Sequence, residues 1–511
     1  MMVSYYSKLI STKLKMIIKM KFTYAFALVL FIQISFGQKN TPELKGIDNN
    51  IELLMERYRA VGAAVAIVKD DKVVYSKGFG YRDLQNQQPV TSNTIFPIGS
   101  TTKAFTGTLL GILESKGQVS LKDKPNLYIP QFQFYNEKMD NLITIDDLLS
   151  HRSGIGNQGT SEVFFPKKDK LEVVQRLKYL KPEAEIKNSF EYSNMGYTLA
   201  GTIVEQITNK SWDSVIKENL FEPLEMVDSY TTLQEMQESN NYAMPYGLYK
   251  GNIEKVKFEE FNSISPAGAI KSTVNDLSNW MLTWLNNGVF NEKQVIPQNY
   301  IREATRLQNI NEDSYEKDAF LFGEGYGWRL RSAYGYYRVD HGGNTFGFSS
   351  SLVMFPFEKI GIVVLTNQDN SELPYMIIDN ITRKLFKLDS YPIEYPVVVK
   401  DIFRPDMDEK GLNNDKLPTH DLNAFCGTYE AKGYGKIKVI SEEDALFVIL
   451  PTFKFKLEHL NYNSFFFKAT DQFKEVFNPQ FTIQFLNNIQ GEVSQLKMYS
   501  QKEPVEFHKK T

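Results

Sequence analysis

Cysteine and histidine are scarce in this chain of 511 residues, which contains one cysteine, Cys426, and five histidines. A single cysteine cannot form an internal disulfide and has no partner for a cysteine-based zinc site. No His-Glu-x-x-His segment occurs, so the sequence gives no support for zinc catalysis. Without disulfides the fold must depend on its hydrophobic core, and we expect Cys426 to be a buried, inert thiol.

Excess positive charge is also missing, because the formal net charge is −3. The chain therefore lacks the basic footprint of a nucleic-acid-binding protein, and its body has no polybasic run for a membrane surface. Hydrophobic residues make up 42% and charged residues 23%, which is ordinary for a globular protein with a real core. At roughly 100–200 residues per domain, the length predicts two or three domains.

The only strongly apolar run lies near the N-terminus, in residues 22–37, "FTYAFALVLFIQISFG". Lysines without acids precede this run, and small residues end it, which is the pattern of a secretory signal peptide. The run is shorter than the ~20 residues of a membrane-spanning helix, the alternative interpretation. We predict a signal peptide over residues 1–37, starting at Met1 or Met20. The mature protein is then periplasmic or extracellular, with no stable membrane anchor.

Hydrophobic periodicity predicts strands and helices through the first three quarters of the chain. Residues 61–80 form a hairpin around Asp70-Asp71, and "GFSSSLVMFP" and "KIGIVVLTNQ" form two later strands. Helices are expected from Ser100 to Gly117 and over 144–150, 195–219, 272–288 and 372–387. Residues 389–420, rich in proline and charge, read as a linker. Short alternating runs in 421–511 predict a small all-β domain.

The segment "FPIGSTTKAF" places Ser100 and Lys103 three positions apart at the start of a predicted helix. Residues i and i+3 share a helical face, so a hydroxyl and an amine would lie side by side. A lysine whose pKa is lowered by burial can take the proton of a serine and make it a nucleophile. Ser-x-x-Lys also occurs at Ser214, Ser314 and Ser494, and Ser100 could instead be a simple helix N-cap.

Two further segments carry groups suited to the same chemistry. In "FEYSNMGY", Tyr192 and Asn194 would face one cavity from an extended or turn segment, if they are not simply a buried tyrosine and a turn asparagine. The phenol can shuttle protons if cations lower its pKa, and the amide can orient a substrate carbonyl. In "VDHGGNTFGF", His341 precedes two glycines that would let a substrate backbone approach a strand edge. Here the alternative is a turn with an incidental histidine.

Taken together and in this order, Ser100-Thr101-Thr102-Lys103, Tyr192-Ser193-Asn194 and His341-Gly342-Gly343 resemble the serine β-lactamase and penicillin-binding-protein superfamily. The resemblance is closest to its branch of class C β-lactamases, D-Ala-D-Ala carboxypeptidases, D-aminopeptidases and esterases. It covers roughly residues 46–388 and includes "LLSHRSGI", "SPAGAIKSTVNDL" and "GYGWRL". It implies an α/β (α+β) β-lactamase/transpeptidase-like domain, with an antiparallel sheet flanked by helices and a helical subdomain from about 110 to 270.

The resemblance also implies a role for each matching position. Ser100 would form the acyl-enzyme, Lys103 would be its general base, and Tyr192 would protonate the leaving group and later activate water. Asn194 would contact substrate and Lys103. The backbone N–H groups of Ser100 and Asn344 would form an oxyanion hole beside Gly342 and Gly343. We expect no metal or cofactor to take part. His151, within "LLSHRSGI", is expected to structure its loop rather than to react.

One position departs from the family's β-lactamases, which usually have Lys-Thr-Gly where this chain has His341-Gly342-Gly343. Histidine at this place is known among the family's D-peptidases and carboxypeptidases. We expect His341 to titrate near neutral pH and to bind an antibiotic's carboxylate less well than a permanent cation. Gly342 also removes a threonine hydroxyl. Both changes argue against an efficient β-lactamase.

The C-terminal residues 421–511 are similar to the lipocalin-like barrel appended to some peptidases of this family, where it lies near the cleft. A solubilising or oligomerising module is the alternative, and the oligomeric state is not predicted. For the whole chain we expect an exported serine hydrolase of peptide or amide bonds, acting on a small-molecule or peptide substrate that can contain D-residues. The alternatives are an esterase, a weak β-lactamase, a penicillin-binding sensor with little turnover, and a binding protein without catalysis.

Overall fold

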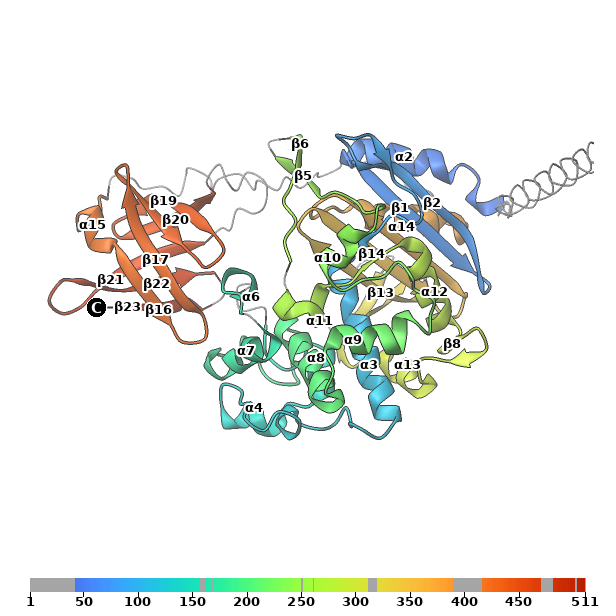
Figure 1. Ribbon diagram of the computed structural model, residues 1–511, viewed down its shortest axis with the longest axis horizontal. Helices are drawn as coiled ribbons and strands as arrows, with labels where there is room; N and C mark the ends of the chain where they lie inside the picture. The colour runs from blue at the N-terminus through green and yellow to red at the C-terminus, as the bar shows by residue number, and fades with distance from the viewer. Residues whose placement is uncertain are drawn as a thin grey trace, which may run out of the picture. The chain divides into compact units, whose positions relative to one another are not determined.

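A nine-stranded antiparallel sheet forms the centre of the N-terminal domain in the described part of this computed structural model (Figure 1). The structure describes residues 42–156, 161–167, 169–249, 251–260, 262–310, 319–389, 416–469, 481–500 and 503–510. The strand order is β10-β11-β12-β13-β14-β15-β1-β2-β3. The strands span Gly62–Lys69 (β1), Lys72–Asp83 (β2), Gln88–Pro89 (β3), Asn309–Ile310 (β10), Ala319–Glu324 (β11), Arg329–Ala333 (β12), Tyr336–Thr345 (β13), Phe348–Phe355 (β14) and Ile360–Thr366 (β15).

The predicted hairpin and the two later strands lie side by side in the middle of this sheet. Strand β1 pairs with β2 across the turn and with β15 on its other side. Asp70 and Asp71 both have positive φ, as a two-residue hairpin turn requires, and aspartate tolerates that conformation. Every residue of β14 and β15 is buried, so both faces of the sheet are covered.

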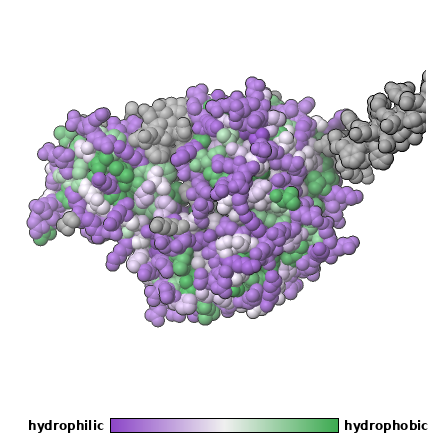
Figure 2. All heavy atoms as spheres, viewed as in Figure 1, coloured by the Kyte–Doolittle hydropathy of each residue, from purple (hydrophilic) through white to green (hydrophobic). Residues whose placement is uncertain are grey.

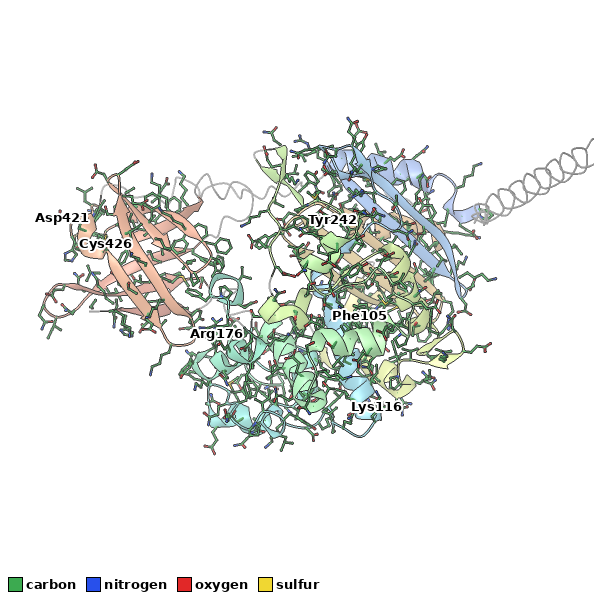
Figure 3. All side chains as sticks on the ribbon, in the orientation of Figure 1. Phe105, Lys116, Arg176, Tyr242, Asp421 and Cys426 are labelled. Atoms are coloured by element: carbon green, nitrogen blue, oxygen red, sulfur yellow. The ribbon has the colours of Figure 1, made fainter. Side chains whose placement is uncertain are left out.

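Helices supply that cover. Helix α14 (Leu373–Leu385) packs on β14 and β15 beside α2 (Ile47–Tyr58), whereas α12 (Val274–Leu285) packs on β1, β2 and β15. Thr273 caps α12 through its side chain, near the predicted start of this helix at 272. The central helix α3 (Thr102–Ser115) is buried along most of its length, and Phe105 stacks on Trp280 of α12 at 3.8 Å between ring centroids (Figure 3).

The region from about 110 to 270 is mainly helical, as expected from the resemblance. Its helices are α4 (Glu137–Leu142), α5 (Ile145–Leu149), α6 (Ser161–Phe164), α7 (Lys170–Val174), α8 (Asn194–Thr208), α9 (Trp212–Ile216), α10 (Leu233–Glu238) and α11 (Ser265–Gly268). A hairpin of β5 (Tyr246–Tyr249) and β6 (Asn252–Lys255) interrupts them. Strand β7 (Lys271–Ser272) pairs with β4 (Phe96–Pro97) and so ties this region to the chain just before Ser100.

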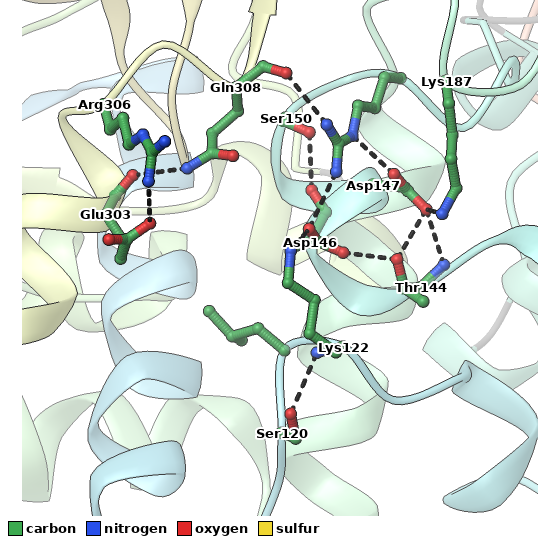
Figure 4. Close-up of polar contacts among 12 residues, drawn as sticks. Ser120, Lys122, Thr144, Asp146, Asp147, Ser150, Lys187, Glu303, Arg306 and Gln308 are labelled. Atoms are coloured by element: carbon green, nitrogen blue, oxygen red, sulfur yellow. Dashed lines mark hydrogen bonds and ion pairs between the residues drawn. The ribbon is translucent and has the colours of Figure 1, made fainter.

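A buried charge network fixes the turn after α5 (Figure 4). Asp146 and Asp147 are fully buried, and both accept from the guanidinium of Arg152, at 2.9 and 2.6 Å. Lys122 contacts Asp146 at 2.6 Å and Lys187 contacts Asp147 at 3.1 Å, so each carboxylate has two cationic partners. Thr144 and Asp147 form a capping box at the start of α5. The network therefore holds residues 150–153 in a turn, with His151 at a φ of 57°.

The C-terminal domain is a closed barrel of strands β16 to β23, joined in sequence order and closed by pairing of β16 with β23. This up-and-down arrangement is the one found in lipocalins. Its strands are Gly427–Ala431, Gly435–Glu442, Ala445–Ile449, Lys454–Asn461, Ser464–Ala469, Thr482–Asn487, Val493–Tyr499 and Val505–Lys509. Buried aromatic rings, among them Tyr429, Phe455 and Phe485, fill its core. The short helix α15 (Leu422–Phe425) precedes β16.

Some predictions lie outside the described residues. These include the signal peptide at 1–37 and most of the predicted linker at 389–420. No helix within the described ranges is both long and apolar enough to span a bilayer. Cys426 is half-buried rather than buried, and burial raises the pKa of its thiol. Hydrophilic residues dominate the molecular face shown in Figure 2.

The Asp146–Asp147–Arg152 network generates a stability prediction. Removing one partner of a buried ion pair leaves unpaired charge and costs about 3–5 kcal/mol. For Arg152→Ala we expect about 3 kcal/mol, the lower end, because Lys122 and Lys187 still contact the two carboxylates. Urea unfolding measures the change. Lys210→Ala, which breaks an exposed pair with Glu218, is the control and should cost ~1 kcal/mol or less. Equal losses in the two variants would contradict the buried network.

Candidate active site

Ser100 lies in a 3-10 turn, Gly99–Thr101 (η2), that runs directly into α3. The prediction of a helix starting at Ser100 is therefore close, but Ser100 is not the N-cap of α3, since Thr101 occupies that position. Gly99 has a φ of 53°, and a Cβ there would lie 2.9 Å from the backbone nitrogen of Asn344. Only glycine fits this close approach, which brings the serine turn against strand β13.

Lys103 is fully buried and its amine lies among three oxygen atoms. Nζ is 3.1 Å from Oγ of Ser100 and donates to Oδ1 of Asn194 at 2.8 Å and to the carbonyl oxygen of Ala267 at 2.8 Å. Burial lowers the pKa of Lys103 well below its ordinary value, although the charge of Glu162 opposes that effect. Three segments that are distant in sequence thus meet at this one amine.

The contacts of Lys103 define what its neutral form can do. The oxygens of Asn194 and Ala267 can only accept, so Lys103 must donate to both. A neutral amine has two N–H groups and one lone pair. When both N–H groups are engaged, the lone pair is left for the third neighbour, the hydroxyl of Ser100. The geometry therefore makes Lys103 an acceptor for the proton of Ser100.

Tyr192 completes a compact group of three side chains. Its phenol hydrogen-bonds to Ser100, and the amine of Lys103 lies 4.7 Å from the centre of its ring. The condition set for a proton shuttle, a phenol pKa lowered by cations, is not met, although Arg329 does act in that direction. Burial raises the pKa of Tyr192, and the hydrogen bond with Ser100 and the charge of Arg329 only partly offset it. Tyr192 is thus a neutral phenol that can pass a proton on while accepting another.

His151 holds the Tyr192-Ser193-Asn194 segment in place. Its Nδ1 accepts from the backbone N–H of Ser193 at 3.1 Å, and its ring lies 4.5 Å from the ring of Tyr192. Ser193 in turn caps α8, which starts at Asn194. Burial and the charge of Lys103 lower the pKa of His151, so it stays neutral. The interpretation of His151 as a structural residue agrees with these contacts.

Strand β13 forms the opposite wall of the site. The β12 ladder reaches only the pair Arg329–Asp340, so among the described strands residues 341–345 pair with β14 alone. A Cβ on Gly343 would lie 2.8 Å from the backbone nitrogen of Ser100. The serine turn and the backbone at residues 343 and 344 of β13 therefore lie against each other. Gly342 is equally constrained, because a Cβ there would overlap the hydroxyl of Tyr375.

His341 does not behave as the sequence predicts. It is fully buried, and burial together with the charges of Arg329 and Lys103 lowers its pKa to about 3. Its Nδ1 donates to the carbonyl oxygen of Gly342 at 2.6 Å, which fixes one neutral tautomer. His341 therefore does not titrate near neutral pH, because burial and the charge of Arg329 lower its pKa more than the charge of Asp340 raises it.

His341 is neutral, and the permanent positive charge near the site comes instead from Arg329. Arg329 was not identified as a site residue from the sequence. It lies within the quoted "GYGWRL" on β12, and its side chain is 39% exposed. Its charge acts on Lys103, Tyr192 and His341 alike. The neighbouring Glu324 is 3.9 Å away, but burial raises the pKa of that carboxyl to about 8. Near neutral pH the charge of Arg329 is consequently not cancelled by Glu324.

Glu162 is a second residue that the sequence did not reveal. It is buried on α6, and its Oε1 accepts from Nδ2 of Asn194 at 3.0 Å. Burial raises the pKa of Glu162, and the hydrogen bond from Asn194 opposes that shift. No spacing pattern links positions 162 and 194, so only the folded structure places this carboxyl next to the Lys103–Asn194 pair.

Comparison with known proteins agrees with this geometry. Residues 47–380 match the family model described as Beta-lactamase, and residues 413–509 match one described as a domain of unknown function (DUF3471). The chain is 30% identical over 339 residues to protein flp of Staphylococcus aureus strain MW2, covering 65% of this chain and 64% of that one. It is 27% identical to the unguisins hydrolase ungD' of Aspergillus campestris, covering 77% of each chain.

Among solved structures, the octameric penicillin-binding protein homologue from Pyrococcus abyssi has the same fold. Its TM-score is 0.60 at 22% identity, covering 90% of this chain and 99% of that one. The family resemblance inferred from the three motifs is confirmed, as is the expected α/β fold followed by a small barrel. The chain belongs to the Beta-lactamase family.

Proposed function

We propose that this protein is an exported serine hydrolase that cleaves peptide or amide bonds through an acyl-enzyme on Ser100. One observation carries the proposal: the buried amine of Lys103 donates to two carbonyl oxygens and lies 3.1 Å from Oγ of Ser100, so that the neutral amine has its lone pair left for that hydroxyl. A buried base of lowered pKa next to a serine is the arrangement that activates a nucleophile. The naming of one relative as a hydrolase is consistent with this proposal.

The reaction follows from the positions of the three side chains. Oγ of Ser100 attacks the carbonyl carbon while its proton passes to Nζ of Lys103. The amide N–H groups of Ser100 and Asn344 stabilise the negative oxygen, an effect worth about 3–4 kcal/mol per donor. Tyr192 gives its proton to the leaving nitrogen and is reprotonated from Lys103. Water then attacks the carbonyl carbon of the acyl-enzyme and gives a proton to Tyr192 and Lys103. The ester bond to Oγ of Ser100 breaks, and Oγ takes that proton back.

Arg329 favours substrates that carry a carboxylate. Its guanidinium is partly exposed, and its charge acts on Lys103, Tyr192 and His341. Guanidinium groups bind carboxylates with two parallel hydrogen bonds. Arg329 pairs with Asp340, directly before residues 341–345 of β13. A peptide that adds as a strand along residues 341–345 would therefore bring a terminal carboxylate toward Arg329. A carboxypeptidase-type activity, with D-residues suggested by the family resemblance, is thus the substrate class we propose.

The nucleophile can be tested without knowing the substrate. We expect a fluorophosphonate probe to label the protein and Ser100→Ala to abolish labelling, whereas Ser214→Ala, at another Ser-x-x-Lys, should label normally. Mass spectrometry of the adduct locates the site.

A penicillin adduct that decays quickly supports turnover, and one that persists supports the sensor alternative. A panel of D- and L-peptides, short esters and a cephalosporin separates the hydrolases. Labelling that survives Ser100→Ala would contradict the mechanism.

The state of Lys103 makes the labelling rate depend on pH. Because only the neutral amine can take the proton, the rate should rise with pH and level off well below pH ~10.4, the value for free lysine. His341, with its pKa at about 3, adds no step between pH 5 and 9. Glu324→Gln removes the carboxyl next to Arg329, whose pKa of about 8 lies in this range. Lys103→Arg cannot lose its proton and should lower the rate about 10²–10⁴-fold. A flat profile, or an active Lys103→Arg variant, would contradict Lys103 as the base.

The role of Arg329 predicts selectivity for free C-terminal carboxylates. Arg329→Met should lower kcat/KM for a peptide with a free C-terminus about 10–100-fold, the range of a hydrogen bond to a charged group. The same peptide as its C-terminal amide should be affected about threefold or less. Arg329→Lys, which keeps the charge but not the planar geometry, should give an intermediate loss. Equal losses for acid and amide would exclude carboxylate binding by Arg329.

A further inference from the structure

The amide of Asn194 must face one way for Lys103 to serve as a base. Its Oδ1 accepts from Lys103 at 2.8 Å, while its Nδ2 donates to Glu162 at 3.0 Å. If the amide were turned over, its NH₂ would face the amine and occupy the lone pair that otherwise meets Ser100. The two ends of an amide are alike in shape, so hydrogen-bond partners decide which orientation is adopted. Glu162, which accepts at the NH₂ end, is the partner that selects the productive one.

The segment that carries Glu162 is held by rings of the barrel. Phe164 packs between Phe453 and Phe481, at 5.6 and 4.9 Å between ring centroids. Phe165 packs against Tyr434 and Phe507 at 5.7 and 5.9 Å. Both phenylalanines of the segment are buried by these contacts. The apolar neighbours of Glu162 in sequence therefore belong to the packing of the barrel.

Polar contacts reinforce this attachment. The hydroxyl of Thr452 in the barrel donates to the carbonyl oxygen of Val163 at 3.3 Å. Arg176, labelled in Figure 3, donates to the carbonyl oxygen of Phe165 at 3.0 Å and also to that of Gly433 in the barrel. The helix α6 is too short to hold its position by its own hydrogen bonds. Its place is set by what it packs against.

We infer that the C-terminal barrel completes the catalytic site by seating Glu162 against Asn194, and that Glu162 is a positioning residue for Lys103. The inference rests on the proposed function, because it concerns the base of that reaction. The barrel rings hold α6, α6 presents the Glu162 carboxyl, and the carboxyl fixes the Asn194 amide. Oε2 of Glu162 is buried without a hydrogen-bond partner in the described structure, so the contact with Asn194 is made through Oε1, and the carboxyl also hydrogen-bonds to its own backbone.

Two substitutions at position 162 test the orientation of the amide. Glu162→Leu keeps the size but removes the acceptor, and should slow fluorophosphonate labelling of Ser100 about tenfold, as for one lost positioned hydrogen bond. Glu162→Gln keeps an acceptor oxygen for Nδ2 of Asn194 and should recover most of that loss. The melting temperature of each variant is measured first, and labelling is carried out at a temperature at which every variant is folded. Wild-type labelling in Glu162→Leu, or equal slowing in both variants, would overturn the inference.

A barrel substitution tests the connection itself. Phe453→Ala removes a ring that packs on Phe164 and should slow labelling as Glu162→Leu does. Because both changes act on the same contact, the double variant Phe453→Ala/Glu162→Leu should label at about the rate of the slower single variant. Phe465→Ala, a buried barrel ring that packs on Phe425 and Phe485, is the matched control and should leave the labelling rate unchanged. If Phe453→Ala labels like wild type, or if Phe465→Ala slows labelling equally, the barrel does not act through α6. Absence of labelling in the wild type would instead contradict the proposed function and this inference together.

Discussion

The hydrogen bonds of one buried amine organise the site. Lys103 donates to Asn194 and Ala267 and lies 3.1 Å from Ser100, so three separate stretches of chain must fold together to satisfy it. Leaving a buried amine without hydrogen-bond partners costs several kcal/mol. That is a large share of the net free energy of folding of a typical domain. The same constraint that holds the subdomains together thus gives the amine its chemistry, because burial favours the neutral form that can accept a proton.

The rest of the fold can be read as support for this amine. The sheet places β13 against the serine turn, and the missing side chain of Gly99 allows the approach. The carboxylates of α5 fix the turn that carries His151, and His151 fixes the segment of Tyr192 and Asn194. Each of these supports is itself buried and hydrogen-bonded, which keeps the reacting groups in one geometry. Arg329, partly exposed, lies where substrate charge can reach it.

Local signals explain what could be predicted from the sequence. The Asp70-Asp71 turn and the apolar strands β14 and β15 depend on near neighbours, and the structure has them where expected. The titration of His341 was predicted wrongly because burial, which the sequence does not show, lowers its pKa far below neutral. Burial likewise raises the pKa of Tyr192. Glu162 and Arg329 were missed because their partners are fixed only by tertiary packing. The partial exposure of Cys426 is also set by tertiary packing and not by its sequence neighbours.

The protonation of Lys103 is the most direct test of this view of the site. Nitrogen NMR of the protein labelled at lysine Nζ, with the Lys103 signal assigned by its loss in Lys103→Arg, follows that one amine through a pH titration. The structure predicts that Lys103 becomes neutral well below the range in which exposed lysines titrate, about pH 10.4. A Lys103 signal that titrates together with the surface lysines would contradict it.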